Sequence, residues 1–75
     1  MKELLETIAK SLVDNPDEVR VEVVEKEDLT VLELHVGEGD MGKVIGRQGR
    51  IAKAIRTVIR SAAAHEPKKV VVDII

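Results

Sequence analysis

Apolar and polar residues follow two different spacings along this 75-residue chain, and the change of spacing separates helices from strands. Residues 2–13 carry apolar side chains every three or four positions, which predicts an amphipathic helix ended by Asn15-Pro16. Residues 19–25 and 30–36 alternate with a period of two, which predicts two half-buried strands joined by the polar turn 26–28. The first half of the chain therefore predicts one helix followed by a β-hairpin.

The second half of the chain predicts two helices and a third strand. The expected ranges are 41–45 for a short helix, 50–65 for a longer helix and 69–75 for a β-branched strand. Asp40 is expected to cap the short helix, since its carboxylate can accept the free amide hydrogens of the first turn. Gly46–Gly49 predicts a tight turn between the helices, and Glu66-Pro67 ends the longer one. The order α-β-β-α-α-β predicts an α+β sandwich with the helices on one face of a three-stranded sheet.

The longer helix carries more apolar surface than one core-facing stripe requires. The stripe expected to cover the sheet comprises Ile51, Ile55, Ile59 and Ala62. Ala54 and Val58 widen the apolar arc beyond that stripe. Either these two residues pack under the first helix, or they form a surface for a partner.

Composition excludes several classes of protein. The chain has no cysteine, so it has neither a disulfide framework nor a thiolate metal site. It has no aromatic residue, so it lacks the stacking platform of many single-strand binders and the signature of an RRM. The acidic N-terminal segment does not resemble a signal peptide, and no apolar run approaches the roughly 20 residues of a membrane span. These features predict a cytoplasmic protein.

Charge is segregated along the chain although the whole carries a net charge of only −2. Residues 1–40 hold four basic and twelve acidic side chains, which is −8, whereas residues 41–60 hold six basic side chains and no acidic one, which is +6. A basic block flanked by acidic segments predicts a localised anion-binding face.

Two glycine patterns match nucleotide-binding motifs in the spacing of their residues but not in their chemistry or structural context. Residues 37–42 read G-x-G-x-x-G, but Glu38 and Asp40 would repel a pyrophosphate, and no parallel βαβ unit surrounds them. Residues 37–43 approach a phosphate-binding loop, but Val44 stands where a Ser or Thr hydroxyl should hold Mg²⁺. We reject both patterns.

A third pattern, V-I-G-x-x-G-x-I at residues 44–51, lies inside the basic block between the two predicted helices. Glycine at 46 and 49 keeps the turn tight and lets a sugar-phosphate backbone approach without a Cβ in the way. The amides of the turn and the positive end of the following helix form an anion site. Additional donors come from Arg47, Gln48 and Arg50. Ile45 and Ile51 are expected to anchor the two helices in the core.

This loop, together with the element order, resembles the KH domain family in its type II, or bacterial, topology. The resemblance covers nearly the whole chain, so residues 1–75 are expected to form a single KH domain similar to the small stand-alone KhpA-type RNA-binding proteins. It implies that the loop clamps the backbone of about four nucleotides of single-stranded RNA. The RNA-binding residues it implies are Lys43, Gly46, Arg47, Gln48, Gly49, Arg50 and Lys53. Bases are expected in an aliphatic groove between these helices and the edge of strand 30–36.

The same resemblance implies a role in post-transcriptional regulation as an RNA chaperone. It also implies a homodimer, or a pair with a KhpB-type KH protein, formed through Ala54 and Val58 of helix 50–65. A protein–protein adaptor and a ribosome-associated assembly factor are the alternative functions, and single-stranded DNA is an alternative ligand.

Catalysis is not expected. His35 faces outward from a strand and His65 lies at a helix end, and neither has a Ser or Cys nucleophile nearby in sequence. The acidic residues lack metal-ligand spacing, so neither a metal nor a cofactor is expected.

Overall fold

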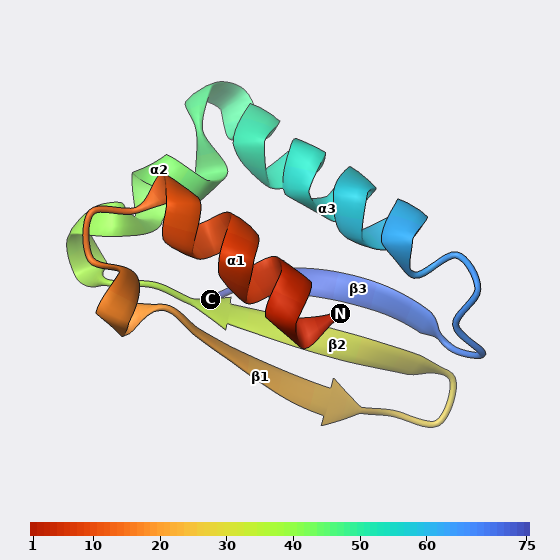
Figure 1. The fold of residues 1–75 in the computed structure, drawn as a ribbon. Helices are drawn as coiled ribbons and strands as arrows, with labels where there is room; N and C mark the ends of the chain where they lie inside the picture. The colour runs from red at the N-terminus through yellow and green to blue at the C-terminus, as the bar shows by residue number, and fades with distance from the viewer.

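A computed structural model describes residues 1–75 and confirms the predicted α+β fold and its element order (Figure 1). The helices are α1 (Lys2–Leu12), α2 (Met41–Ile45) and α3 (Arg50–Ala62), and the strands are β1 (Arg20–Glu25), β2 (Leu29–His35) and β3 (Lys69–Ile74). Short 3₁₀ turns cover Pro16–Glu18, Glu38–Asp40 and Arg47–Gly49. No helix combines the length and the apolar character needed to cross a membrane.

The sheet has the order β1-β2-β3, so β2 is its central strand. β1 pairs antiparallel with β2 across the hairpin, and β3 pairs parallel with β2 after the chain has crossed over through α2 and α3. A parallel partner requires such a crossover, whereas the hairpin needs only a short turn. β1 and β3 are therefore the two edges of the sheet.

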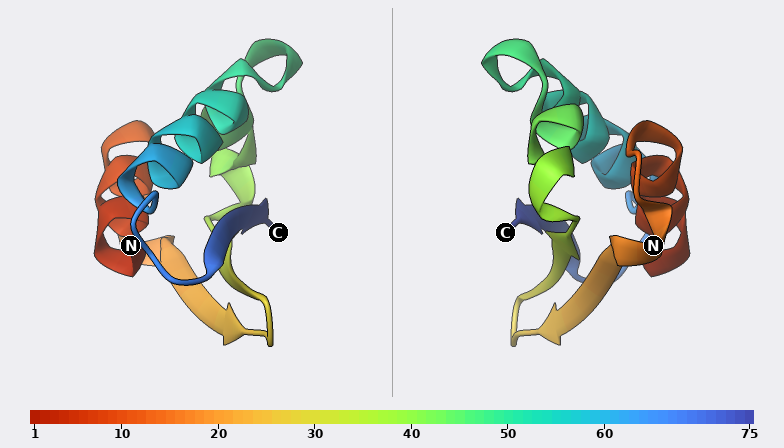
Figure 2. Two further views of the ribbon diagram at one scale, coloured as in Figure 1. Left: turned by 90° about the vertical axis from the view of Figure 1, so that its right-hand side faces the viewer. Right: turned by 90° about the vertical axis from the view of Figure 1, so that its left-hand side faces the viewer.

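All three helices lie on one face of the sheet (Figure 2). α1 packs against β1 and α3, and α3 packs against β3. The core between the layers comprises Leu5 and Ala9 from α1, Val44 from α2, Ile55 and Ile59 from α3, and Val19, Val21, Leu32, Leu34 and Val72 from the sheet and its approach. The opposite face of the sheet carries no helix.

The buried stripe of α3 differs from the predicted one. Ala52, Ile55, Ile59 and Ala63 are buried, whereas Ile51 is only partly buried and Ala62 is exposed. The helix ends at Ala62, three residues before its predicted end. A helix continued to Pro67 would bring the proline ring against the carbonyl of Ala63, four residues earlier, and the chain instead turns towards β3.

Ala54 and Val58 are exposed on α3, Val58 with 48% of its surface. The alternative in which they pack under α1 is therefore wrong. The helix turns its Ala52–Ile55–Ile59 side towards α1 and the sheet, and this leaves Ala54 and Val58 facing solvent.

Asp40 precedes α2 as predicted, but its carboxylate does not cap that helix. The side chain is buried and accepts hydrogen bonds from the backbone N–H of Asp14 at 3.2 Å and of Asn15 at 3.0 Å. A third bond comes from Asn15 Nδ2 at 3.4 Å. Asp40 thus fastens the segment after α1 to the start of α2, a contact between residues about 25 positions apart.

Candidate nucleic-acid interface

The loop between α2 and α3 projects away from the sheet (Figure 1). Three of its four residues have positive φ angles: Gly46 at 75°, Gln48 at 57° and Gly49 at 74°. Positive φ is costly for residues that carry a Cβ. The two glycines of the motif therefore stand where the backbone requires them, and Gln48 adopts the left-handed conformation without being glycine.

The surroundings of the two glycines differ. A Cβ on Gly46 would lie 2.5 Å from Ile51 Cγ1, so the side chain of Ile51 leaves no room for a larger residue at position 46. A Cβ on Gly49 would meet no heavy atom within 4 Å. Gly49 therefore presents bare backbone to solvent, and this is the place where a ligand backbone can approach.

One apolar residue from each flanking helix fixes the loop to the core. Val44 of α2 is fully buried, and Ile51 of α3 packs against the core. Ile45 is 36% exposed, so its predicted role as an anchor is wrong. Neighbouring helix positions lie about 100° apart; Val44 points into the core, and Ile45 is turned towards solvent.

The start of α3 leaves amide groups available for an anion. Gly49 is the N-cap and makes no side-chain cap, and the first turn contains no acidic residue. The backbone N–H groups of that turn carry the positive end of a 13-residue helix dipole. This arrangement suits a phosphate group.

The side chains around the loop are exposed and mainly basic. Arg47, Gln48, Arg50 and Lys53 are all exposed, and Arg50 Nη2 donates to Gln48 Oε1 at 3.3 Å. Lys43 differs from the others because its Nζ pairs with Asp14 Oδ2 at 3.4 Å. The structure thus brings the predicted site residues together on one end of the molecule, with Lys43 already partnered.

A groove of about 390 Å³ extends from this end along α3 and β3. It is lined by Lys53, Arg56, Thr57 and Arg60 from the helix and by Lys69, Val70, Val71 and Val72 from the strand. The predicted groove wall, the edge of strand 30–36, is wrong because β2 is paired on both sides and has no free edge. The free edge beside α3 belongs to β3.

Sequence reasoning did not assign Arg56, Arg60 or Lys69 to the site. Arg56 and Arg60 lie within the basic block of residues 41–60, and this concentration of positive charge could have indicated that they belong to the site. Lys69 carried no signal, since its place beside α3 depends on the parallel pairing of β3 with β2. Arg56 Nε donates to the backbone carbonyl of Val72 at 3.2 Å and ties the helix to the strand edge.

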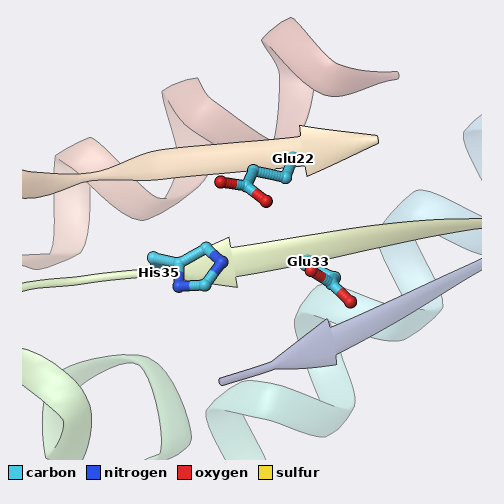
Figure 3. A group of neighbouring side chains, drawn as sticks. All are labelled: Glu22, Glu33 and His35. Carbon is cyan, nitrogen blue, oxygen red and sulfur yellow. The ribbon is translucent and has the colours of Figure 1, made fainter. Parts of the chain in front are cut away.

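A separate polar cluster lies on the helix-free face of the sheet, where Glu22, Glu33 and His35 gather (Figure 3). Glu22 and Glu33 are paired across β1 and β2, and one ligand atom from each of the three residues lies within 4.8 Å of the others. Arg20 Nε already contacts Glu22 Oε1 at 3.1 Å, which brings a positive charge into the cluster. His35 faces outward as predicted, and its Nε2 is buried without a hydrogen-bond partner. This cluster is on the opposite side of the sheet from the loop.

Comparison with known proteins gives the family. Residues 2–74 match the family described as KhpA/KhpB, KH domain. The chain is 69% identical to the RNA-binding protein KhpA of Clostridium acetobutylicum and 65% identical to that of Clostridium perfringens, in each case over the full length of both chains. It is 47% identical to the KhpA of Aquifex aeolicus, over all of this chain and 95% of that one.

The fold also occurs within a larger protein. The crystal structure of Aquifex aeolicus Era, a Y63A variant bound to GDP and AlF4⁻, superposes on this chain with a TM-score of 0.69. The match covers 97% of this chain and 28% of the Era chain at 20% sequence identity. At that identity the likeness concerns the fold alone.

Proposed function

Since the chain belongs to the KhpA/KhpB family of KH domains, a non-enzymatic family, we propose that it binds single-stranded RNA and clamps the RNA backbone with the loop 46–49. The observation that carries this proposal is the open backbone of Gly49 at the uncapped start of α3, among exposed cations. The residues proposed to contact RNA are Lys43, Gly46, Arg47, Gln48, Gly49, Arg50 and Lys53. Gly46 acts by shaping the loop, and the others meet the phosphates.

The proposed clamp holds about four nucleotides, as KH domains do. Their bases lie towards the groove between α3 and β3, where Val70 and Val72 offer an aliphatic surface. No aromatic side chain takes part, so affinity depends on the backbone contacts and is modest. Each neutralised phosphate contributes about −0.7 to the slope of log affinity against log salt concentration.

The test compares wild type with the double variant Arg47→Asp, Gln48→Asp in fluorescence anisotropy with a short labelled RNA. The variant places two negative charges where phosphates should lie and leaves both glycines and the core unchanged. Aspartate tolerates the left-handed backbone of position 48. We expect binding to be lost.

A matched control carries the same change of charge away from the loop: Lys26→Asp with Thr7→Asp, on the hairpin and on α1. The control should bind RNA nearly as wild type does. Equal binding by the loop variant and wild type would refute the clamp, and absence of binding by all three proteins would favour the adaptor function.

We further propose that the exposed apolar side of α3 is a partner surface. Ala54 and Val58 face solvent there, and Leu12, at the end of α1, is 36% exposed. The proposed partner is a second copy of this chain or a KhpB-type KH protein. Two clamps in one dimer would raise the avidity for RNA without any new contact.

The cellular role that we propose is that of an RNA chaperone in post-transcriptional regulation, in the cytoplasm. A backbone clamp with weak base preference can hold many RNAs single-stranded. Cross-linking in cells followed by sequencing of the bound nucleic acid would name the ligand. Recovery of mainly ribosomal RNA would favour an assembly factor instead, and recovery of DNA would assign the site to single-stranded DNA.

A further inference from the structure

The helix-free face of the sheet carries a row of acidic side chains that crosses all three strands. Glu22 of β1 lies opposite Glu33 of β2, and Glu33 lies beside Asp73 of β3. Directly paired residues point to the same face of a sheet, and like charges in such pairs are destabilising. Arg20 forms an ion pair with Glu22, but no ion pair involves Glu33 or Asp73. The three carboxylates and the one guanidinium leave a net charge of −2 on this part of the face.

An imidazole lies at the end of this row. His35 follows Glu33 by two residues on β2, so its side chain is on the same face. Figure 3 shows its ring with one nitrogen turned towards the carboxylates of Glu22 and Glu33. The Nε2 atom of His35 is buried and has no hydrogen-bond partner, although buried polar atoms are rarely left without one. The face therefore offers a nitrogen donor that no protein atom uses.

The three side chains together form a donor set for a divalent metal ion. One ligand atom from each of Glu22, Glu33 and His35 lies within 4.8 Å of the others. The ligand atoms of a tetrahedral zinc ion are about 3.3 Å apart, because each lies about 2.0–2.1 Å from the metal. Small rotations of the side chains are enough to reach that spacing, since Glu22 is exposed and Glu33 is only half-buried. One nitrogen and two oxygens suit zinc better than magnesium or calcium, which prefer oxygen ligands alone.

We propose that Glu22, Glu33 and His35 bind one zinc ion on the helix-free face, with water in the fourth position. The ion joins β1 to β2 and neutralises the net negative charge of the row. Arg20 competes for Glu22, but both side chains of that pair are more than half exposed, and an exposed ion pair adds little to stability. The spacing of residues in the sequence gave no indication of this site, because Glu22 meets the other two ligands only through the hairpin register. The proposal is independent of RNA binding, since the loop lies on the opposite side of the sheet.

The test measures zinc binding to the full chain, without an affinity tag, by isothermal titration calorimetry and by thermal unfolding in zinc and in EDTA. For wild type we expect one zinc ion per chain. At free zinc a hundredfold above the dissociation constant, Tm should be about 10–20 °C higher than in EDTA. Magnesium at the same concentration should leave Tm unchanged. The ring ¹⁵N resonances of His35 should shift on addition of zinc, which identifies the ligand directly.

The variant Glu33→Gln separates zinc binding from a purely structural role. It removes the central charge of the row, so its Tm in EDTA should equal or exceed that of wild type, while the increase in zinc is lost. His35→Gln should weaken zinc binding by at least about tenfold. His65→Gln is the matched control, because His65 is the other histidine of the chain and is exposed beyond the end of α3, and it should bind zinc as wild type does.

Three results would overturn the proposal. One is a wild-type Tm that is the same in zinc and in EDTA. Another is an unchanged zinc affinity in His35→Gln, and the third is a loss of zinc binding in His65→Gln. The Tm of each variant in EDTA shows that it is folded, so a lost response to zinc reports on the site itself.

Discussion

Gly46 and Gly49 hold equivalent places in the loop motif, yet they do different things in the molecule. Gly46 combines φ 75° with ψ 176°, a region almost confined to glycine, and Ile51 fills the space beside it. Gly49 has φ 74° and ψ 15°, which other residues adopt at moderate cost, and open space lies beside it. One glycine serves folding, and the other keeps the surface open to a ligand.

The two alanine variants should therefore separate stability from binding. Gly46→Ala should lower the free energy of unfolding by about 2–4 kcal/mol, since strain of about 1–3 kcal/mol adds to a clash with Ile51. Gly49→Ala should cost about 1–2 kcal/mol for a left-handed alanine and should weaken RNA binding at temperatures where it is fully folded. Urea denaturation measures the first effect and anisotropy the second. Equal losses of stability would contradict the distinction.

Lys43 offers a second test at the residue scale because it is the one proposed contact that already has an acidic partner. Asp14→Asn removes the carboxylate 3.4 Å from its Nζ and keeps the backbone N–H that Asp40 accepts. An exposed ion pair is worth up to about 1 kcal/mol, so RNA affinity should increase up to about fivefold. The control is Lys26→Gln, which removes the same charge from the hairpin. If Lys43→Gln raises the dissociation constant for RNA no further than this control does, then Lys43 does not contact RNA.

Asp40 should make stability depend on pH. Burial alone would raise the pKa of this carboxyl, but the hydrogen bonds from Asn15 and Asp14 and the nearby Lys43 outweigh burial and hold the pKa below its ordinary value of 3.8. A lowered folded pKa stabilises the protein above pH 3.8, and this stabilisation is lost as the pH falls through the folded pKa.

The variant Asp40→Asn has no carboxylate at this position, so it lacks the pH-dependent stabilisation that Asp40 provides. The stability difference between wild type and the variant should be constant near pH 7 and should shrink below about pH 4. Urea denaturation at a series of pH values gives this difference, in which the effects of the other acidic residues cancel. A difference that is independent of pH would contradict the assignment.

At the scale of elements, helix periodicity predicted α3 but did not settle which way it faces. The amphipathic pattern allowed Ala54 and Val58 to lie either under α1 or in solvent. Helix periodicity gives the directions of side chains relative to one another, but not the direction in which the whole helix faces. Apart from Ile51, the residues that differ between prediction and structure are three alanines: Ala52 and Ala63 are buried, and Ala62 is exposed. Alanine gives little signal in a periodicity argument, since it fits either environment.

The exposed side of α3 gives a test by Val58→Glu. Glutamate favours helix, so α3 should keep its fold while a buried charge disrupts an apolar interface. Sedimentation equilibrium should shift from dimer to monomer. Val23→Glu is the matched control, since Val23 is 44% exposed on β1 and lies away from α3. An unchanged mass for the Val58 variant would exclude this surface as a homodimer interface.

At the scale of the whole molecule, local patterns predicted every helix and strand, with strand ends within one residue, but not the sheet order. β3 pairs with a strand some 40 positions earlier, and no local pattern encodes which neighbour it chooses. The groove was for that reason assigned to the wrong strand, while the loop, which is local in sequence, was located correctly. Asp40 was misassigned in the same way, because its partners come from the segment after α1.

A dimer would also appear in the stability of the whole molecule. A core of ten buried residues in a 75-residue chain is small, and association should add to its stability. Raising the protein concentration a hundredfold should then increase Tm by about 5 °C or more for a domain of this size. Calorimetry of Val58→Glu should give a Tm independent of concentration. Concentration independence in wild type would indicate a monomer.

The separation of charge described in the sequence also has a kinetic consequence. Six of the twelve basic residues lie on α2, the loop and α3, where there is no acidic residue, whereas acidic residues outnumber basic ones on α1, β1, β2 and the hairpin taken together. The folded protein therefore has an electric dipole despite its small net charge. In the field of a polyanion such a dipole rotates the molecule before contact. Encounters then begin with the loop facing the RNA, and the acidic side repels the RNA in the opposite orientation. Association should therefore be faster at low ionic strength than a net charge of −2 suggests.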